Sequence, residues 1–530
     1  MRVTPTYDPP RAAKDGVDLT PAVRRSAADR RQLRRRIALV GLITFVVALA
    51  AIDARATYGA RISVDEPQYL LTAISLGEDF DLDISDEIRE DRFLPFHERP
   101  TLSQQTIDLN DQGQRLSPHD PLLPLALAGP MRLGGWVAAR IAMAAFAGLT
   151  AMATVWTAVR RFGLASGPAS LVIGAFSLSP PLIAFGNQIY PAMLSALCVV
   201  GGVALVTSPR ARVRAATAIP VVALPWLSVK YAPHAAVLAV AIAWTLRHHR
   251  RLAAATMAFL AAMGVAYLAL HQGIYGGWTV YSTGDHFVEG GGEWEVVGSN
   301  FNPLGRTRRL VGLLVDKNFG LAAWAPAFLA APLALTWFGA TKQRHRLLLF
   351  SLVGVGWAMA TWIALTMHGW WWPGRQVVPV VPLLVIAITT AVVGSRARIG
   401  AVLAASALAI AGWLWLVVEA STDRRTLIVD FFETSWPVYR AWRQVLPNMA
   451  GFELTETGLT VAWTIVLVAP CVALLWRAAA SSSGTDARNH DADAGHTDGG
   501  GDPHRGPLSP AGDLIAEGPE SGERSVEALR

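Results

Sequence analysis

An acidic pair begins the segment Asp65-Glu66-Pro67-Gln68-Tyr69, which follows the first long apolar run of the chain. Pro67 predicts the start of a helix, because proline is favoured in the first helical turn. Glu66 would then lie near the N-terminus of that helix, where its negative charge complements the helix dipole. Asp65 would remain free to point at a substrate and to act as a general base. The alternative is that both acids are ordinary residues of a solvated loop.

A cationic segment with three consecutive tryptophans occupies residues 368–375 and ends in Arg375. A guanidinium can bind two phosphate oxygens at once, and the faces of Trp371 and Trp372 are suited to stacking on a sugar ring. The Pro-Gly pair before Arg375 predicts a turn that projects its side chain. We therefore expect a phosphate and sugar site here, and the alternative is an aromatic belt at a membrane surface.

Membrane helices are the elements that must position these residues. Of the 530 residues, 52% are hydrophobic and only 16% are charged, whereas soluble domains carry about a quarter charged residues. The composition predicts an all-α polytopic membrane protein in a lipid bilayer. The net charge of +6 does not indicate nucleic acid binding, because much of it is arginine beside apolar runs. The absence of any Asn-x-Ser/Thr sequon agrees with a bacterial source.

Apolar runs near the length that crosses a bilayer recur along the chain. We expect about twelve spans, near 37–53, 134–158, 165–186, 190–207, 215–230, 231–246, 252–271, 319–338, 347–367, 377–394, 399–418 and 458–476. Arginine and lysine clusters mark every second connection, which the positive-inside rule assigns to the cytoplasm. Both termini are therefore predicted to be cytoplasmic. The long loops 54–133, 272–318, 368–376 and 419–457 are predicted to lie outside the cell membrane.

The basic residues within 306–317 are an exception to the positive-inside pattern, because the predicted topology places them on the outer side. Arg308, Arg309 and Lys317, with the neighbouring Asp316, would suit an anionic phosphate. Lys230, at another outer span end, either faces a lipid phosphate or anchors the helix at the interface. No Asp or Glu falls in the middle of a predicted span, which argues against an ion-coupled transporter.

Three regions follow from these patterns. Residues 1–36 and 478–530 are predicted to be disordered cytoplasmic tails, because they contain few large apolar residues. Residues 37–477 form the predicted membrane domain, with a first outer loop at 54–133. The acidic run 78–83 in that loop could bind a cation, and a solvated loop is the favoured interpretation. Residues 121–133 are expected to form a short amphipathic helix at the interface.

Together these motifs resemble the polyprenyl-phosphate-sugar-dependent glycosyltransferases of the GT-C class, close to protein O-mannosyltransferases and the aminoarabinose transferases of lipid A. The similarity covers roughly residues 37–418. Asp65 to Tyr69 match the family's D-E-x-x-Y after the first span, and Ala192 stands where an acid often follows the segment Gln188 to Pro191. The other matching segments are 117–121, which contains His119, 316–321 with Pro326, and 369–375 with Pro379.

The resemblance implies a GT-C-like bundle, with short helices in the outer loops, that transfers a mannose-like sugar from a polyprenyl phosphate to a hydroxyl acceptor with inversion. Asp65, with Glu66 beside it, would be catalytic. The donor-binding set would comprise Arg375, Lys317, Arg308, Arg309, Lys230, Tyr69, His119, Asp316, Trp371 and Trp372.

The acceptor would be an envelope glycan, a glycolipid or a protein. A divalent cation, Mg²⁺ or Mn²⁺, is used by some members of this class and not by others. The alternatives from other classes are a transporter or flippase of lipid-linked sugar precursors and a membrane scaffold without catalytic activity.

Overall fold

The computed structural model describes residues 27–102, 106–108, 114–280, 302–364, 366–450 and 453–494. The chain divides into two compact units, Met1–Leu475 and Trp476–Arg530. All predicted catalytic and donor-binding residues belong to the first unit.

Helices dominate the described residues, in agreement with the predicted all-α class. Their bounds are α1 Ala27–Leu49, α2 Glu66–Glu78, α3 Ser85–Arg89, α4 Leu94–His97, α5 Leu122–Arg160, α6 Ser166–Ser177, α7 Leu182–Phe185, α8 Pro191–Val206, α9 Ala211–Ala215, α10 Ala218–Leu227, α11 Ala232–Leu246, α12 Arg250–Tyr275, α14 Pro303–Thr307, α15 Arg309–Val315, α16 Leu321–Trp324, α17 Ala331–Ala340, α18 Arg346–Ala358, α19 Val381–Val392, α20 Arg396–Ser421, α21 Pro437–Trp442 and α22 Leu454–Ala494.

Shorter elements complete the fold. They are the 3₁₀ turns η1 Val229–Tyr231, η3 Pro326–Ala330, η5 Val378–Val380, η6 Phe431–Glu433 and η7 Arg443–Val445, and the π-helical turn η4 Met359–Ile363. The strands β1 Ile107–Asp108 and β2 Arg115–Leu116 pair antiparallel, with Ile107 opposite Leu116.

Six helical segments in the described residues are long and apolar enough to cross a membrane. They are Leu122–Arg160, Val229–Leu246, Arg250–Tyr275, Arg346–Ile363, Arg396–Ser421 and Leu454–Ala480. Three shorter apolar helices, Pro191–Val206, Pro326–Ala340 and Val378–Val392, also fall on predicted spans. The membrane character of the chain is therefore supported, whereas the number of twelve spans stays a prediction.

Helix α5 is the centre of the first unit and packs against α1, α2 and α8. Its close approach to α1 depends on two glycines. A Cβ at Gly148 would stand 2.8 Å from the carbonyl oxygen of Gly41, closer than real Cβ contacts allow. Small residues at such crossings let helix backbones approach closely and gain packing contacts.

The predicted interfacial helix at the end of the first loop is the beginning of α5. The backbone leaves helical geometry at Gly134 and Gly135, so residues 122–133 form an arm set off from the long apolar part. This arm packs beneath α2, where a Cβ at Gly77 would stand 3.1 Å from the carbonyl oxygen of Ala128. The arm formed by the kink thus supports α2, the helix that follows Asp65.

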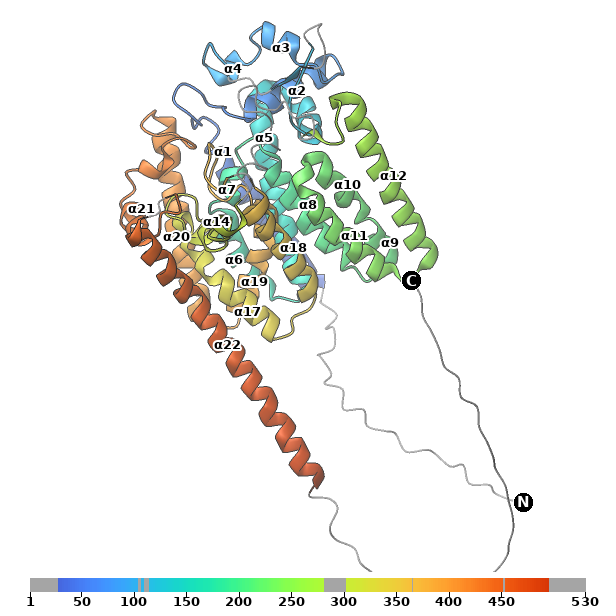
Figure 1. Cartoon of the computed structure of the whole chain (residues 1–530), viewed down its shortest axis with the longest axis vertical. Helices are drawn as coiled ribbons and strands as arrows, with labels where there is room; N and C mark the ends of the chain where they lie inside the picture. The colour runs from blue at the N-terminus through green and yellow to red at the C-terminus, as the bar shows by residue number, and fades with distance from the viewer. Residues whose placement is uncertain are drawn as a thin grey trace, which may run out of the picture. The chain divides into compact units, whose positions relative to one another are not determined.

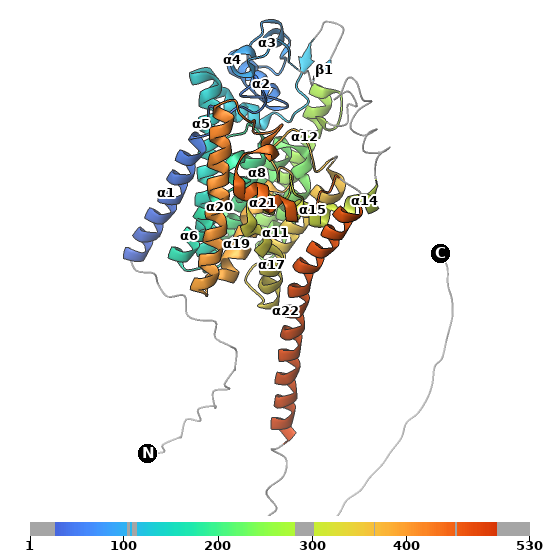
Figure 2. The same cartoon turned by 90° about the vertical axis from the view of Figure 1, so that its left-hand side faces the viewer.

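The segment 54–133, which the sequence predicts to be the first outer loop, contains the short helices α2, α3 and α4. Figures 1 and 2 show α2, α3 and α4 gathered at one end of the first unit, next to the end of α12. Leu116 of β2 packs there with Tyr275 of α12 and Val280.

The first and last helices extend beyond the predicted tail boundaries at 36 and 478. Helix α1 begins at Ala27, and α22 continues to Ala494. Residues 27–36 are arginine-rich, but arginine and alanine are good helix formers, and Leu33 is buried at 2% exposure. Residues 27–36 are therefore helical, although their charge and low apolar content predicted disorder.

Candidate functional site

Asp65 is the N-cap residue of α2, and Pro67 lies in the first helical turn, as the sequence predicts. The side chain of Asp65 makes no capping hydrogen bond to the helix. The preceding residue, Val64, has a φ of 62°, which is unusual for a β-branched side chain. Residues in such conformations persist only where the surrounding structure holds them, and they concentrate at functional sites.

Asp65 is not free, contrary to the expectation from the sequence. Its Oδ2 accepts a hydrogen bond from a guanidinium nitrogen of Arg375 at 2.7 Å. The side chains of Arg375 and Asp65 are 10% and 15% exposed, so the pair is largely enclosed but keeps an accessible edge. Residues 310 positions apart thus meet in the fold, which brings together the predicted base and the predicted phosphate ligand.

The turn before Arg375 depends on glycine. Gly374 has a φ of 86°, a conformation that side chains with a Cβ rarely adopt. A Cβ there would also stand 2.8 Å from the Leu321 side chain. The predicted Pro-Gly turn therefore directs the guanidinium towards Asp65.

Two aromatic rings enclose the Arg375 guanidinium. Its central carbon lies 4.1 Å from the ring centre of Tyr190 and 5.0 Å from that of Trp371, both within cation–π range. Burial alone would lower the pKa of Arg375, but the carboxylate of Asp65 raises that pKa above its usual value. The site therefore keeps a permanent, oriented positive charge.

Glu66 has a different environment from Asp65. It is fully buried, and its Oε1 accepts a hydrogen bond from the Ile189 backbone nitrogen at 2.7 Å. Its Oε2 lies 3.4 Å from the backbone nitrogen of Ser63. Burial raises the pKa of Glu66, against the opposing effects of Arg140 and these two donors. The geometry favours a positioning role for Glu66, because it fastens α2 to the segment that carries Tyr190.

Arg140 of α5 fixes the backbone that precedes Asp65 in the sequence. Its guanidinium is 1% exposed and donates to the backbone carbonyls of Ile52 and Arg61. The backbone before Asp65 is therefore fixed to α5 at two points, Ile52 and Arg61.

Tyr69 and His119, both predicted from family-like segments, stack at 4.3 Å between ring centres with 11° between their planes. Tyr69 also lies edge-on to Tyr190, at 6.3 Å. The next residue, Asp120, accepts hydrogen bonds from Tyr267 at 2.9 Å and from the Val229 backbone nitrogen at 3.0 Å. The end of the first loop is thus anchored to α12 and η1, which sets His119 against Tyr69.

Asp316 and Lys317 belong to a second polar cluster. Asp316 is fully buried, and its carboxylate accepts from the backbone nitrogens of Asn318, Phe319 and Met449 at 3.0, 2.7 and 2.8 Å. Lys317 lies 3.6 Å from Glu456. It lines a cavity of about 570 Å³ with several polar side chains, including Arg425, Glu433, Arg440, Arg443 and Glu456.

Three further predicted residues, Trp372, Arg308 and Arg309, lie in other surroundings than the Asp65–Arg375 pair. Trp372 is fully buried against Trp324, Trp413 and Phe431, so its face is closed to a sugar in this structure. Arg309 donates to the Ala364 carbonyl at 2.7 Å, just beyond η4. Arg308 is half-buried at the N-cap of α15.

Lys230 lies over its neighbour Tyr231, at 5.3 Å from the ring centre. This contact fits the interfacial-anchor interpretation of the sequence. Tyr231 itself lies within electrostatic range of Arg375.

The predicted cation site at 78–83 is divided by the fold. Asp81 accepts from Ser75 Oγ at 2.7 Å. Asp83 accepts from the Ser85 hydroxyl and from the backbone nitrogens of Ser85 and Arg115, the latter two each at 3.0 Å. Burial would raise the pKa of Asp83, but these hydrogen bonds lower it. Both acids therefore organise the loop, while Asp79 joins a different group of carboxylates.

Tyr190 and Arg140 are the two site residues that sequence reasoning assigned no role. Tyr190 stands in the segment that resembles the family, and Arg140 is a charged residue in an otherwise apolar run, so a signal existed for both. Their partners, Arg375 and the backbone near residues 52–61, are distant in sequence and could not be read from it.

The assembled site has an enclosed guanidinium suited to a phosphate and, within 2.7 Å of it, a carboxylate suited to proton transfer. Comparisons of the chain with protein-family models, with curated proteins and with solved structures found no match.

Proposed function

We propose that this chain is a membrane glycosyltransferase that moves a monosaccharide, mannose or a similar sugar, from a polyprenyl phosphate to a hydroxyl acceptor, with inversion. The reaction would take place on the extracytoplasmic face, as the charge pattern of the sequence predicts. The observation that carries this proposal is the contact between Asp65 and Arg375, because it joins a base and a phosphate ligand from distant segments.

The ion pair corresponds to a resting state in this proposal. A phosphate can take both donor positions of a guanidinium, so the donor phosphate would compete with Asp65 for Arg375. Binding of the donor would release the Asp65 carboxylate beside the sugar. Tyr190 and Trp371 would hold the guanidinium plane in place during this exchange.

The transfer itself is a single displacement. The acceptor oxygen forms a bond to the anomeric carbon of the sugar, while the bond from that carbon to the phosphate oxygen breaks. The hydroxyl proton passes to Asp65, and the bonding electron pair leaves with the phosphate, whose charge Arg375 stabilises. The products are a glycosylated acceptor and a free polyprenyl phosphate.

The supporting residues would act by fixing this geometry. Glu66 ties the start of α2 to the Ile189 backbone, and Arg140 fixes the loop backbone before Asp65. A displacement of the reacting groups by about 1 Å can cost roughly a hundredfold in rate. We therefore expect substitutions of either residue to reduce turnover without abolishing donor binding.

The decisive experiment reconstitutes the full chain in liposomes with a sugar-labelled polyprenyl phosphate and a crude envelope extract as acceptor. A transferase moves the label from the isoprenoid to the extract, and the transfer depends on Asp65 and Arg375. A flippase moves the label between leaflets and leaves it on the isoprenoid, which would overturn the proposal. Asp53→Asn is a control, because Asp53 is an acid immediately before that loop, with a side chain that is 77% exposed.

A further inference from the structure

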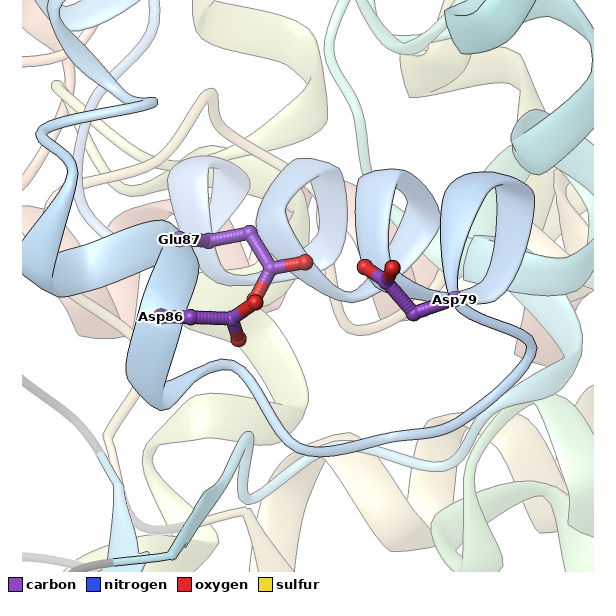
Figure 3. Close-up of side chains that lie close together, drawn as sticks. All are labelled: Asp79, Asp86 and Glu87. Carbon is purple, nitrogen blue, oxygen red and sulfur yellow. The ribbon is translucent and has the colours of Figure 1, made fainter.

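Three carboxylates of the first outer loop, those of Asp79, Asp86 and Glu87, meet away from the Asp65–Arg375 pair. Each contributes an oxygen, and these oxygens lie within 4.8 Å of one another. Asp79 is the C-cap of α2, whereas Asp86 and Glu87 lie in the first turn of α3. Figure 3 shows the side chains extending towards a common space between the two helices.

Glu87 is the member of this group that a solvated acidic loop does not explain. Its side chain is buried, with the residue only 2% exposed, and its Oε2 has no hydrogen-bond partner among the described residues. Burial, and then the neighbouring Asp86, raise the pKa of Glu87 to about 8. A buried acceptor without a hydrogen-bond partner destabilises the folded state. A ligand that pairs with this carboxylate would remove that cost.

Basic side chains do not supply that ligand. Arg92 lies within electrostatic range of Glu87, but its guanidinium is paired with Glu78 at 2.8 Å. In the part of the chain that the structure describes, no ion pair joins Asp79, Asp86 or Glu87 to a basic side chain. Three acids thus converge without a counter-charge in contact.

We propose that Asp79, Asp86 and Glu87 bind a calcium ion. Calcium prefers carboxylate oxygens, and it accepts six to eight oxygens in an irregular arrangement that water can complete. Asp79 is exposed and Asp86 is partly exposed, which leaves room for such water. The C-terminal end of α2 also favours a cation, because the helix dipole is negative there.

This site is distinct from the proposed catalytic site. Asp65 precedes α2 and Asp79 follows it, so the 13 residues of the helix separate the two by about 20 Å. The ion would join the end of α2 to the start of α3. Its role would be to brace the first outer loop, and the inference does not depend on sugar transfer.

The test measures calcium binding by the purified full chain in detergent micelles, using titration calorimetry with calcium chloride and thermal unfolding. We expect one saturable site with a Kd of about 10⁻⁴ to 10⁻³ M, the range of extracellular calcium sites. Calcium should raise the midpoint temperature Tm, because it binds the folded state. Magnesium should bind more weakly, since it demands near-ideal octahedral geometry.

Glu87→Gln keeps the shape of the side chain and removes its charge, so it should weaken calcium binding by about tenfold or more. The matched control is Glu90→Gln, which removes an exposed charge at the C-cap of α3 and should change the Kd by less than about twofold. In the absence of calcium, Glu87→Gln should not lower Tm, because glutamine keeps the shape of the side chain and carries no buried charge.

Equal calcium binding by the Glu87→Gln and Glu90→Gln proteins would overturn the proposal, as would the absence of a saturable site in the unaltered chain. If Glu87→Gln does not fold, Asp86→Asn provides the second measurement. An unchanged Kd in that variant would also exclude the site.

Discussion

Asp65 and Arg375 were each predicted by the same reasoning as Asp316 and Lys317, yet the fold uses the two sets differently. In the first region, a carboxylate faces a guanidinium at an accessible edge, enclosed by aromatic rings. In the second region, the Asp316 carboxylate is fully buried and accepts from three backbone nitrogens. The first arrangement can exchange partners with a ligand, whereas the second holds a loop in shape.

The difference shows that the partners of a charged loop residue indicate whether it can react or only holds the loop in shape. An aspartate whose acceptor positions are filled by backbone donors cannot accept a proton without breaking the local fold. An aspartate paired with a cationic side chain can be released when an anion takes that cation. Residue type alone does not separate these cases, because each segment carries an aspartate.

The largest effect is expected for Asp65→Asn. Asparagine keeps the shape but cannot take the proton, so turnover should fall by about a thousandfold. Glu66→Gln should be milder, since Glu66 holds the backbone in place. The measurement is label transfer per folded molecule, with Asp53→Asn as the control. Near-normal turnover in the Asp65→Asn protein would remove Asp65 from the reaction.

Arg375→Ala should reduce turnover by about a hundredfold, because the leaving phosphate loses its cation. Arg375→Lys should recover only part of this loss, since an ammonium cannot form two parallel hydrogen bonds. Lys317→Ala, which alters the second cluster, serves as the comparison and should change turnover by only a few-fold. A greater loss from Lys317→Ala than from Arg375→Ala would reverse the assignment of the two regions.

Asp316→Asn should act on stability. The amide nitrogen of asparagine cannot accept, so at least one buried backbone donor loses its partner, at a cost of about 1–3 kcal/mol. Thermal unfolding in detergent should show a lower Tm, while turnover per folded molecule stays close to normal. Asp423→Asn is the control, because that side chain is 61% exposed. An unaltered Tm with lost transfer would move Asp316 into the reaction.

The smallest effect is expected at Val64, whose φ is 62°. Val64→Gly should remove about 1 kcal/mol of backbone strain, offset in part by lost packing and by the freer unfolded chain. Val64→Ala keeps the strain and loses the packing, so it should be the less stable variant by thermal unfolding. The opposite order would show that the backbone at Val64 is not strained. A several-fold loss of turnover in the Gly variant would indicate that the conformation orients Asp65.

The sequence by itself determined the class of the fold and pointed to Asp65 and Arg375 as candidate site residues. Apolar runs of helical length predict membrane helices, because a bilayer leaves backbone groups no partner outside the helix. Pro67 and the Pro-Gly turn before Arg375 set local backbone geometry, which depends on neighbouring residues only. These local rules located the start of α2 and the projection of Arg375 correctly.

Only the tertiary structure decided which of the predicted charges meet. Asp65 and Arg375 are 310 residues apart, and their contact depends on the packing of α5 and on the segment carrying Tyr190. The burial of Trp372, the enclosure of Asp316 and the convergence of Asp79 with Asp86 and Glu87 arise in the same way. Each depends on which elements pack together, and no local pattern of apolar and polar residues encodes that choice.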